Sequence, residues 1–258
     1  MHRTQSMPCN NKNEQDEDKV ISILLNSSDD FKRFHEKEWK VRNIPTHWCL
    51  IHDLENEAQA RRCPKTDPKE YCIDFRNCPT LENLTKDLYI FAHEMTHIIR
   101  FHENKDLKIS TINSLRYNRF PPIAKGIVSH ILEDTAVKRF LCSKYKFNLL
   151  PHYEETISNS RISLEGIEKE PQGLKRTELL LQMIKERILW GLIKDRKSST
   201  IWTNYETWLL SRPFSSIIEE RNEVVSMIQE IEWDTREQQR PVFELIVDKC
   251  KLGDMITC

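Results

Sequence analysis

The strongest chemical signal in the chain is the run His93-Glu94-Met95-Thr96-His97. An α-helix has about 3.6 residues per turn, so two histidines four positions apart lie one above the other on one helix face. Two imidazole nitrogens can then reach one ion without distorting the backbone. Glu94 lies about 100° round the helix from His93, beside such an ion, where a general base for a water molecule belongs. The run therefore predicts a zinc site on His93 and His97, with Glu94 as the catalytic base.

The neighbouring residues predict the helix that this site requires. An apolar stripe lies opposite His93 at helical spacing and gives that side a core to pack against. Thr80 is a suitable N-cap, and the helix should end between His102 and Asp106. The stripe consists of Leu84, Leu88, Phe91, Met95, Ile98 and Ile99.

A third zinc ligand is expected from the next predicted helix. Two histidines alone hold zinc poorly, and catalytic zinc sites usually have three protein ligands. Pro121-Pro122 begins a helix that should run from Ile123 to about Tyr145. Glu133 lies in the middle of its apolar face, where a carboxylate is costly unless something compensates its charge. A bound cation would do so, which makes Glu133 the predicted third ligand.

Two neighbours of Glu133 leave alternatives open. His130 lies one turn earlier on the same face and is a rival ligand, while Asp134 could accept the second ring N–H of a ligand histidine. Glu133 could also be an ordinary surface carboxylate near Lys138. A proton donor or oxyanion-stabilising group could come from Tyr145, His152 or Tyr153, and the spacing does not select among them.

Composition and pattern predict an α+β chain that is predominantly helical. Five glycines in 258 residues argue against a β-barrel, a β-sandwich or a glycine-loop nucleotide-binding fold. The best strand candidates are Thr46–Leu54 and Tyr71–Phe75, on either side of a polar stretch, Glu55–Lys69, and they predict a small antiparallel sheet. From Leu174 onwards the pattern is helical, with breaks expected at Pro213 and Pro241.

Three regions are expected along the chain. Residues 1–19 contain almost nothing apolar and should form a disordered lead-in. Residues 20–155 should form the core that carries the metal site, with a short helix capped near Ser28. A loop is expected from Arg161 to Gln172, and residues 173–258 should form a helical region. Its tryptophans are predicted to pack in the core rather than to line a peptide-binding groove. They are Trp190, Trp202, Trp208 and Trp233.

Charge and hydropathy exclude several partners and suggest a compartment. The 39 basic residues nearly balance the 40 acidic ones, so no net field attracts nucleic acid or an anionic membrane. No apolar run of about 18 residues predicts a membrane span, and no apolar segment near the N-terminus resembles a signal peptide. We therefore expect a cytoplasmic protein that acts on a protein or peptide, in an oligomeric state that the sequence does not indicate.

The cysteines predict reduced, buried thiols rather than disulfides. Eight cysteines in an intracellular chain of this length are typical of individually buried residues. Four of them could instead form a structural zinc site, although no C-x-x-C pair is present. They are Cys49, Cys63, Cys72 and Cys78. His47 and His52 could also be ligands, but histidines near strands are more often structural.

These residues resemble a known family. A short strand, a helix with Phe-Ala-His-Glu-Met-Thr-His and a following helix with Glu133 and Ala136 are similar to the zincin metallopeptidases of the gluzincin type. The nearest likeness is to the compact ImmA/IrrE-like branch, whose pattern is His-Glu-x-x-His followed by Glu-x-x-Ala. It covers roughly Tyr71 to Pro151.

The resemblance implies a zincin-like core and a zinc-dependent peptidase. In that family the residues matching His93, His97 and Glu133 hold Zn²⁺, while the match to Glu94 takes the proton from the metal-bound water and returns it to the leaving amine. Two alternatives stay open. The chain could be a non-catalytic regulatory or interaction protein that keeps a zinc-binding scaffold, or a helical bundle in which His93, His97, His130 and Glu133 hold two metals.

Overall fold

The computed structural model describes residues 14–15, 17–51, 54, 58–63, 70–76, 84–112, 120–193, 196–228, 231 and 233–258. The chain divides into two compact units. The first consists of Met1–Asn104 with Phe140–Asn148, and the second of Lys105–Arg139 with Leu149–Cys258. The predicted division into a core at 20–155 and a helical region at 173–258 differs, because residues 105–139 and 149–155 belong to the second unit.

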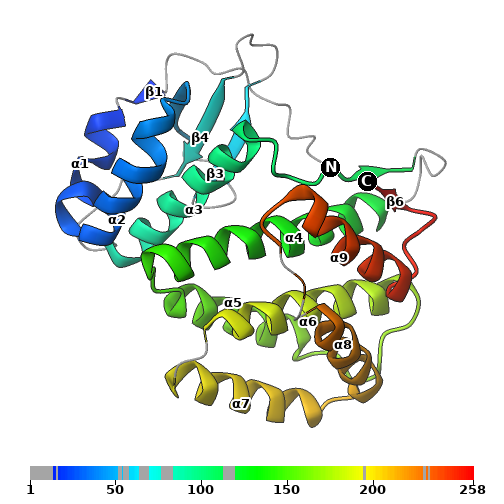
Figure 1. Ribbon diagram of the computed structural model, residues 1–258. Helices are drawn as coiled ribbons and strands as arrows, with labels where there is room; N and C mark the ends of the chain where they lie inside the picture. The colour runs from blue at the N-terminus through cyan, green and yellow to red at the C-terminus, as the bar shows by residue number, and fades with distance from the viewer. Residues whose placement is uncertain are drawn as a thin grey trace. The chain divides into compact units, whose positions relative to one another are not determined.

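The first unit contains one mixed sheet with the strand order β1-β2-β4-β3 (Figure 1). Its strands are β1 (Glu14–Gln15), β2 (Thr46–Leu50), β3 (Ala58–Arg62) and β4 (Tyr71–Phe75). β2 and β4 are parallel, so the predicted antiparallel pairing of these two strands is wrong. The predicted polar stretch contains β3, which pairs antiparallel with β4. Every residue of the central strand β4 is buried.

The helices of the first unit follow the sequence pattern closely. They are α1 (Glu17–Ser27), α2 (Asp29–Phe34) and α3 (Leu84–His102), and α2 continues into a π-helical turn at His35–Trp39 and a 3₁₀ turn at Lys40–Arg42. The predicted cap is confirmed, because the Ser28 hydroxyl accepts a hydrogen bond from the Phe31 amide at 3.2 Å. The expected disorder of residues 1–19 does not extend to the strand at 14–15 or to the start of α1.

Helix α3 packs its apolar side against the sheet, as the stripe predicts. The Phe91 ring stacks on Trp48 at 6.0 Å between centroids and meets Phe75 edge-on at 5.7 Å. Met95 and Ile98 are fully buried on the same side. The observed helix ends where the sequence predicts, while the expected cap, Thr80, lies outside the described residues.

The second unit is built from helices and one small strand pair (Figure 1). Its helices are the part of α4 (Phe120–Tyr145) up to Arg139, α5 (Leu150–Leu164), α6 (Leu174–Leu192), α7 (Arg196–Leu210), α8 (Ser215–Ile228) and α9 (Arg236–Lys249). β5 (Ser110–Thr111) pairs antiparallel with β6 (Ile256–Thr257). The predicted class, α+β and predominantly helical, is confirmed. Within the described residues, no helix combines the length and the apolar character needed to cross a membrane.

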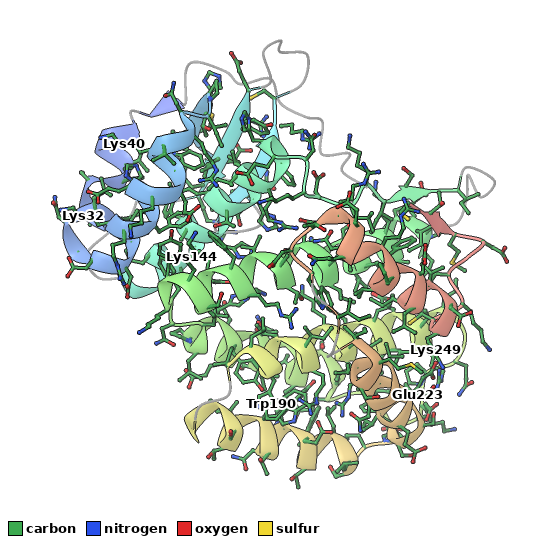
Figure 2. The ribbon with its side chains drawn as sticks, in the orientation of Figure 1. Lys32, Lys40, Lys144, Trp190, Glu223 and Lys249 are labelled. Atoms are coloured by element: carbon green, nitrogen blue, oxygen red, sulfur yellow. The ribbon has the colours of Figure 1, made fainter. Side chains whose placement is uncertain are left out.

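Contacts between helices organise the second unit. α6 packs against α8, and α5 packs against both α6 and α7. Trp202 and Trp233 are buried, as expected for packing residues, whereas Trp190 is half-buried and stacks on Trp202 at 5.3 Å. An ion pair between Lys249 and Glu223 joins α9 to α8 at 2.5 Å (Figure 2).

Two sequence expectations about loops are wrong in this unit. α5 continues to Leu164, past the predicted loop start at Arg161. Pro241 lies inside α9 rather than breaking it. An internal proline costs about 3 kcal/mol, but burying one large apolar side chain gains about 1.5–3 kcal/mol. Val242, Phe243 and Ile246 are all buried beyond the proline, so their burial outweighs its cost.

A buried carboxylate links the π-helical turn to the end of α4 in the first unit. Glu38 is 5% exposed and accepts hydrogen bonds from the Tyr145 hydroxyl and the Lys144 ammonium group (Lys144 is labelled in Figure 2). Arg42 donates to the other carboxylate oxygen at 3.0 Å. Burial alone would raise the pKa of Glu38, but these donors outweigh it and hold the pKa below its ordinary value of 4.5.

We expect Glu38→Gln to lower the free energy of unfolding by about 2 kcal/mol at pH 7, because Lys144 and Arg42 lose the negative charge that compensates them. A carboxyl group whose pKa is lowered by folding stabilises the protein above its unfolded pKa and loses that effect as the pH falls through the folded pKa. The difference between wild type and variant should therefore shrink below pH 4.5. Urea unfolding at pH 7 and pH 3.5 measures both quantities. Glu36→Gln, an exposed neighbour, is the matched control, and an equal loss in both variants would contradict the assignment.

Candidate metal centre on helix α3

The structure brings the two predicted histidine ligands together in the first unit. His93 Nε2 and His97 Nε2 lie 3.1 Å apart, and both rings are half-buried. Two nitrogens bound to one zinc at about 2.0–2.1 Å, at tetrahedral angles, would lie about 3.3–3.4 Å apart. The observed separation is close to this expected nitrogen–nitrogen distance, so the two side chains fit a shared cation.

Tyr89 orients the first histidine. Its hydroxyl oxygen lies 3.2 Å from His93 Nδ1, on the ring nitrogen opposite the one that meets His97. If Nδ1 carries the proton and donates it to Tyr89, the lone pair of Nε2 is available for a cation. The sequence analysis did not assign this role, although Tyr89 precedes His93 by one helical turn and could have been identified by that spacing.

Glu94 is held at the edge of the sheet. Its Oε2 accepts a hydrogen bond from the backbone N–H of Ala60, in β3, at 2.6 Å. The Cys63 amide donates to the Glu70 carbonyl, so alternate residues of β3 bond to β4 and Ala60 directs its amide away from that strand. The bond fixes one carboxylate oxygen of Glu94, the residue after His93, against β3. Ala60 was not predicted, because β3 itself was not.

The predicted residues of α4 lie in the part of the helix that belongs to the second unit. Glu133 is 9% exposed, which excludes the surface-carboxylate interpretation. Its Oε1 accepts a hydrogen bond from the Leu107 amide at 3.2 Å, so a backbone donor compensates part of its charge. Asp134 is half-buried and His130 is exposed. The third-ligand assignment stays a prediction.

The candidate proton donors have other surroundings. The Tyr145 hydroxyl donates to Glu38, which gives it a structural role in the first unit. Tyr153 is completely buried in the second unit, where burial raises the pKa of its hydroxyl well above the ordinary value. His152 is half-buried in α5 of the same unit. Neither α5 residue belongs to the unit that contains the histidine pair.

Comparison with known proteins does not identify a family. No protein-family model, curated protein or solved structure matches the chain. The likeness to gluzincins therefore depends on the residues of α3 and α4 alone.

We expect purified protein supplied with zinc to retain a zinc ion on the helix α3 site, and His97→Ala to lose it. Tyr89→Phe should keep the site but weaken zinc binding about 10–100-fold, the usual effect of removing a partner of a ligand histidine. Competition with a chelator of known affinity gives both results. His102→Ala is the control, since this exposed histidine lies on the same helix. Unchanged zinc content in His97→Ala would rule out the site.

Proposed function

We propose that this chain is a zinc-dependent peptidase of the zincin type. The observation that supports it best is the pair of imidazole nitrogens 3.1 Å apart, together with the carboxylate of Glu94, the residue after His93, anchored to the backbone of β3. A chance pair of surface histidines would not require a half-buried carboxylate one residue along, held by the backbone of a neighbouring strand. The donor set of two imidazoles also suits zinc among the common cations.

These positions suggest a role in the reaction for each residue. His93 and His97 would hold a zinc ion, which would supply Lewis acidity to lower the pKa of water to about 7 and to polarise the scissile carbonyl. Glu94, held at Oε2 by the Ala60 amide, accepts the proton of the attacking water. The same carboxyl group then delivers that proton to the leaving amine. With its proton on Nδ1, His93 would donate to the Tyr89 hydroxyl and keep the lone pair of Nε2 for the metal.

The position of β3 favours a peptide as the substrate. Among the described strands, β3 stands at the end of the sheet order and packs against α3. An extended peptide can add to such an edge through main-chain hydrogen bonds, and these bonds do not depend on the side chains of the peptide. The bond from Ala60 to Glu94 puts the catalytic carboxylate at this edge. A peptide lying along β3 would therefore present its carbonyl groups near the proposed base.

Helix α4 is proposed to supply the third ligand, as the sequence assigns it. Glu133 is the first candidate, because its burial fits a carboxylate that needs a positive partner besides the Leu107 amide. Asp134 and His130 are the alternatives. Three protein ligands would leave the fourth position of a tetrahedral ion for water, as hydrolysis requires.

Glu94→Gln should reduce peptide hydrolysis by about 10²–10⁴-fold and leave zinc binding unchanged, since it removes the base and no ligand. The measurement is cleavage of a mixed peptide library, read by mass spectrometry, beside the zinc content of both proteins. Glu103→Gln is the control, since Glu103 directly follows α3 and pairs with Arg42 at 2.7 Å. Wild-type protein that binds zinc but cleaves nothing would favour the non-catalytic scaffold.

Single alanine variants identify the third ligand. We expect Glu133→Ala to weaken zinc binding more than Asp134→Ala or His130→Ala, because a lost direct ligand costs more than a lost neighbour. Zinc affinities of the three proteins, measured by chelator competition, give the ranking. If Asp134→Ala has the largest effect, Asp134 is the ligand, and equal affinities in all three would exclude this stretch of α4.

A further inference from the structure

The sheet of the first unit has two chemically different faces. Side chains alternate between the faces along each strand, so the cross-strand pairs show which residues share one. Trp48 pairs with Ile73 on the face that meets α3. The other face is polar and rich in sulfur, and its residues are buried or half-buried. It carries His47, Cys49, Gln59, Arg61, Cys63, Glu70, Cys72 and Asp74.

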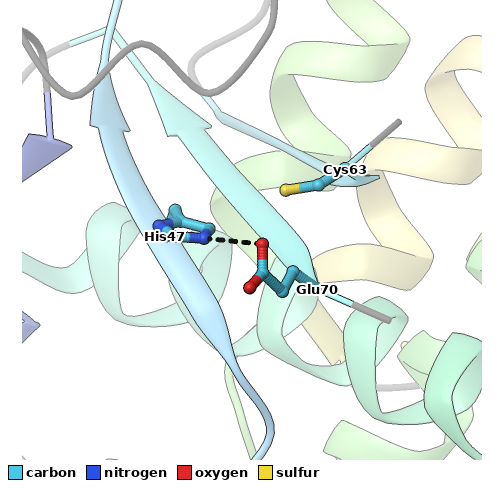
Figure 3. A group of neighbouring side chains, drawn as sticks. All are labelled: His47, Cys63 and Glu70. Carbon is cyan, nitrogen blue, oxygen red and sulfur yellow. Dashed lines mark hydrogen bonds and ion pairs between the residues drawn. The ribbon is translucent and has the colours of Figure 1, made fainter. Parts of the chain in front are cut away.

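Three potential metal ligands converge at one end of this second face. They are His47 in β2, Cys63 directly after β3 and Glu70 directly before β4. One ligand atom from each lies within 4.8 Å of the others. The backbone holds them there, since the Cys63 amide donates to the Glu70 carbonyl at 2.9 Å. Figure 3 shows the His47 ring and the Glu70 carboxylate side by side, with the Cys63 sulfur directed towards them.

We propose that His47, Cys63 and Glu70 form a second cation site, separate from helix α3, which binds a divalent metal of the zinc class. The distance from His47 Nε2 to Glu70 Oε2 is 3.3 Å. A nitrogen and an oxygen ligand bound to one tetrahedral zinc ion would lie about 3.3–3.5 Å apart, so the two atoms fit a shared ion. A thiolate and an imidazole select zinc-like ions, whereas magnesium and calcium prefer oxygen ligands alone.

The surrounding charges are compatible with a divalent ion. With Cys63 as thiolate, the site would carry two negative charges, one from sulfur and one from Glu70. Arg61, whose charge acts on Cys63, is held by Asp74 through two hydrogen bonds of 2.5 and 3.1 Å, so its charge is locally balanced. The side chains of His47 and Glu70 are 28% and 33% exposed, which gives an ion a path from solvent to the buried sulfur.

Two features oppose metal binding and must be overcome. Burial raises the pKa of Cys63 to about 11, so an ion would have to displace the thiol proton. Cys72 is disulfide-bonded, contrary to the expectation of reduced thiols, whereas Cys63 is a free cysteine whose sulfur lies 2.6 Å from that of Cys72. Exchange of the Cys63 thiol into that disulfide is therefore the competing outcome. A bound ion would tie β2 to the β3–β4 hairpin at one end of the sheet.

Cobalt(II), added to metal-free full-length protein under reducing conditions, tests the site. A cobalt–thiolate bond gives an intense charge-transfer band in the near ultraviolet, and the proposed ligands on α3 and α4 include no sulfur. In the His97→Ala background, which removes the helix α3 site, we expect a band that saturates at one equivalent and is lost when Cys63→Ser is added. His47→Gln and Glu70→Gln should retain the thiol but weaken cobalt binding by at least about 10-fold. Cys250→Ser, which removes another buried thiol, is the control and should keep the band.

The proposal is overturned if the wild type shows no band, if the band persists in Cys63→Ser, or if mass spectrometry of alkylated protein finds Cys63 in a disulfide despite the reductant. If Cys63→Ser fails to fold by circular dichroism, the two glutamine variants decide, because unchanged affinity in both also overturns it. His97→Ala should keep the band, so failure of the helix α3 site and failure of this one are distinguishable.

Discussion

The rotation of helix α3 about its own axis is the constraint on which the candidate chemistry depends. Phe91 fixes it, because its ring lies against Trp48 on one side and Phe75 on the other. At about 100° per residue, His93 then lies about 200° and His97 about 240° from Phe91, on the side away from these aromatic rings, while Glu94 lies about 60° from Phe91 on the remaining side. The apolar contact between α3 and the sheet therefore also determines where His93, His97 and Glu94 lie.

The sheet transmits that constraint because its central strand cannot move independently. β4 is buried along its whole length and pairs with β2 on one side and β3 on the other. A one-residue slip of β3 would exchange its two faces and turn the Ala60 amide towards β4, away from Glu94. The same slip would separate Cys63 from Glu70, so one register supports both the proposed base and the proposed second cation site.

The sequence predicted what depends on local periodicity and missed what depends on pairing between distant segments. The helix around His93, the cap at Ser28 and the helical second unit all follow from spacing within about twenty residues. β3 did not, because Ala58–Arg62 combines small and charged residues and is stabilised by its partner strand rather than by its own composition. For the same reason the Ala60 contact and the grouping of His47 with Cys63 and Glu70 could not be found. Pro241 shows the converse error, since burial beyond it overrides a strong local signal.

Buried charged and polar groups are accommodated in two ways in this chain. In the second unit Glu186 is almost fully buried and accepts hydrogen bonds from the Tyr205 and Ser160 hydroxyls, while Arg221, with no exposed surface, pairs with Glu206. Each of these buried groups has hydrogen-bond or ion-pair partners within the protein, so its role is structural. The first unit pairs Glu38 with Lys144, Tyr145 and Arg42 in the same way. It also groups imidazoles and carboxylates that can all act as acceptors, at separations that suit a shared cation. Such acceptor-rich groups are stable only with protons or a metal between them, and that requirement separates candidate chemistry from ordinary packing in this chain.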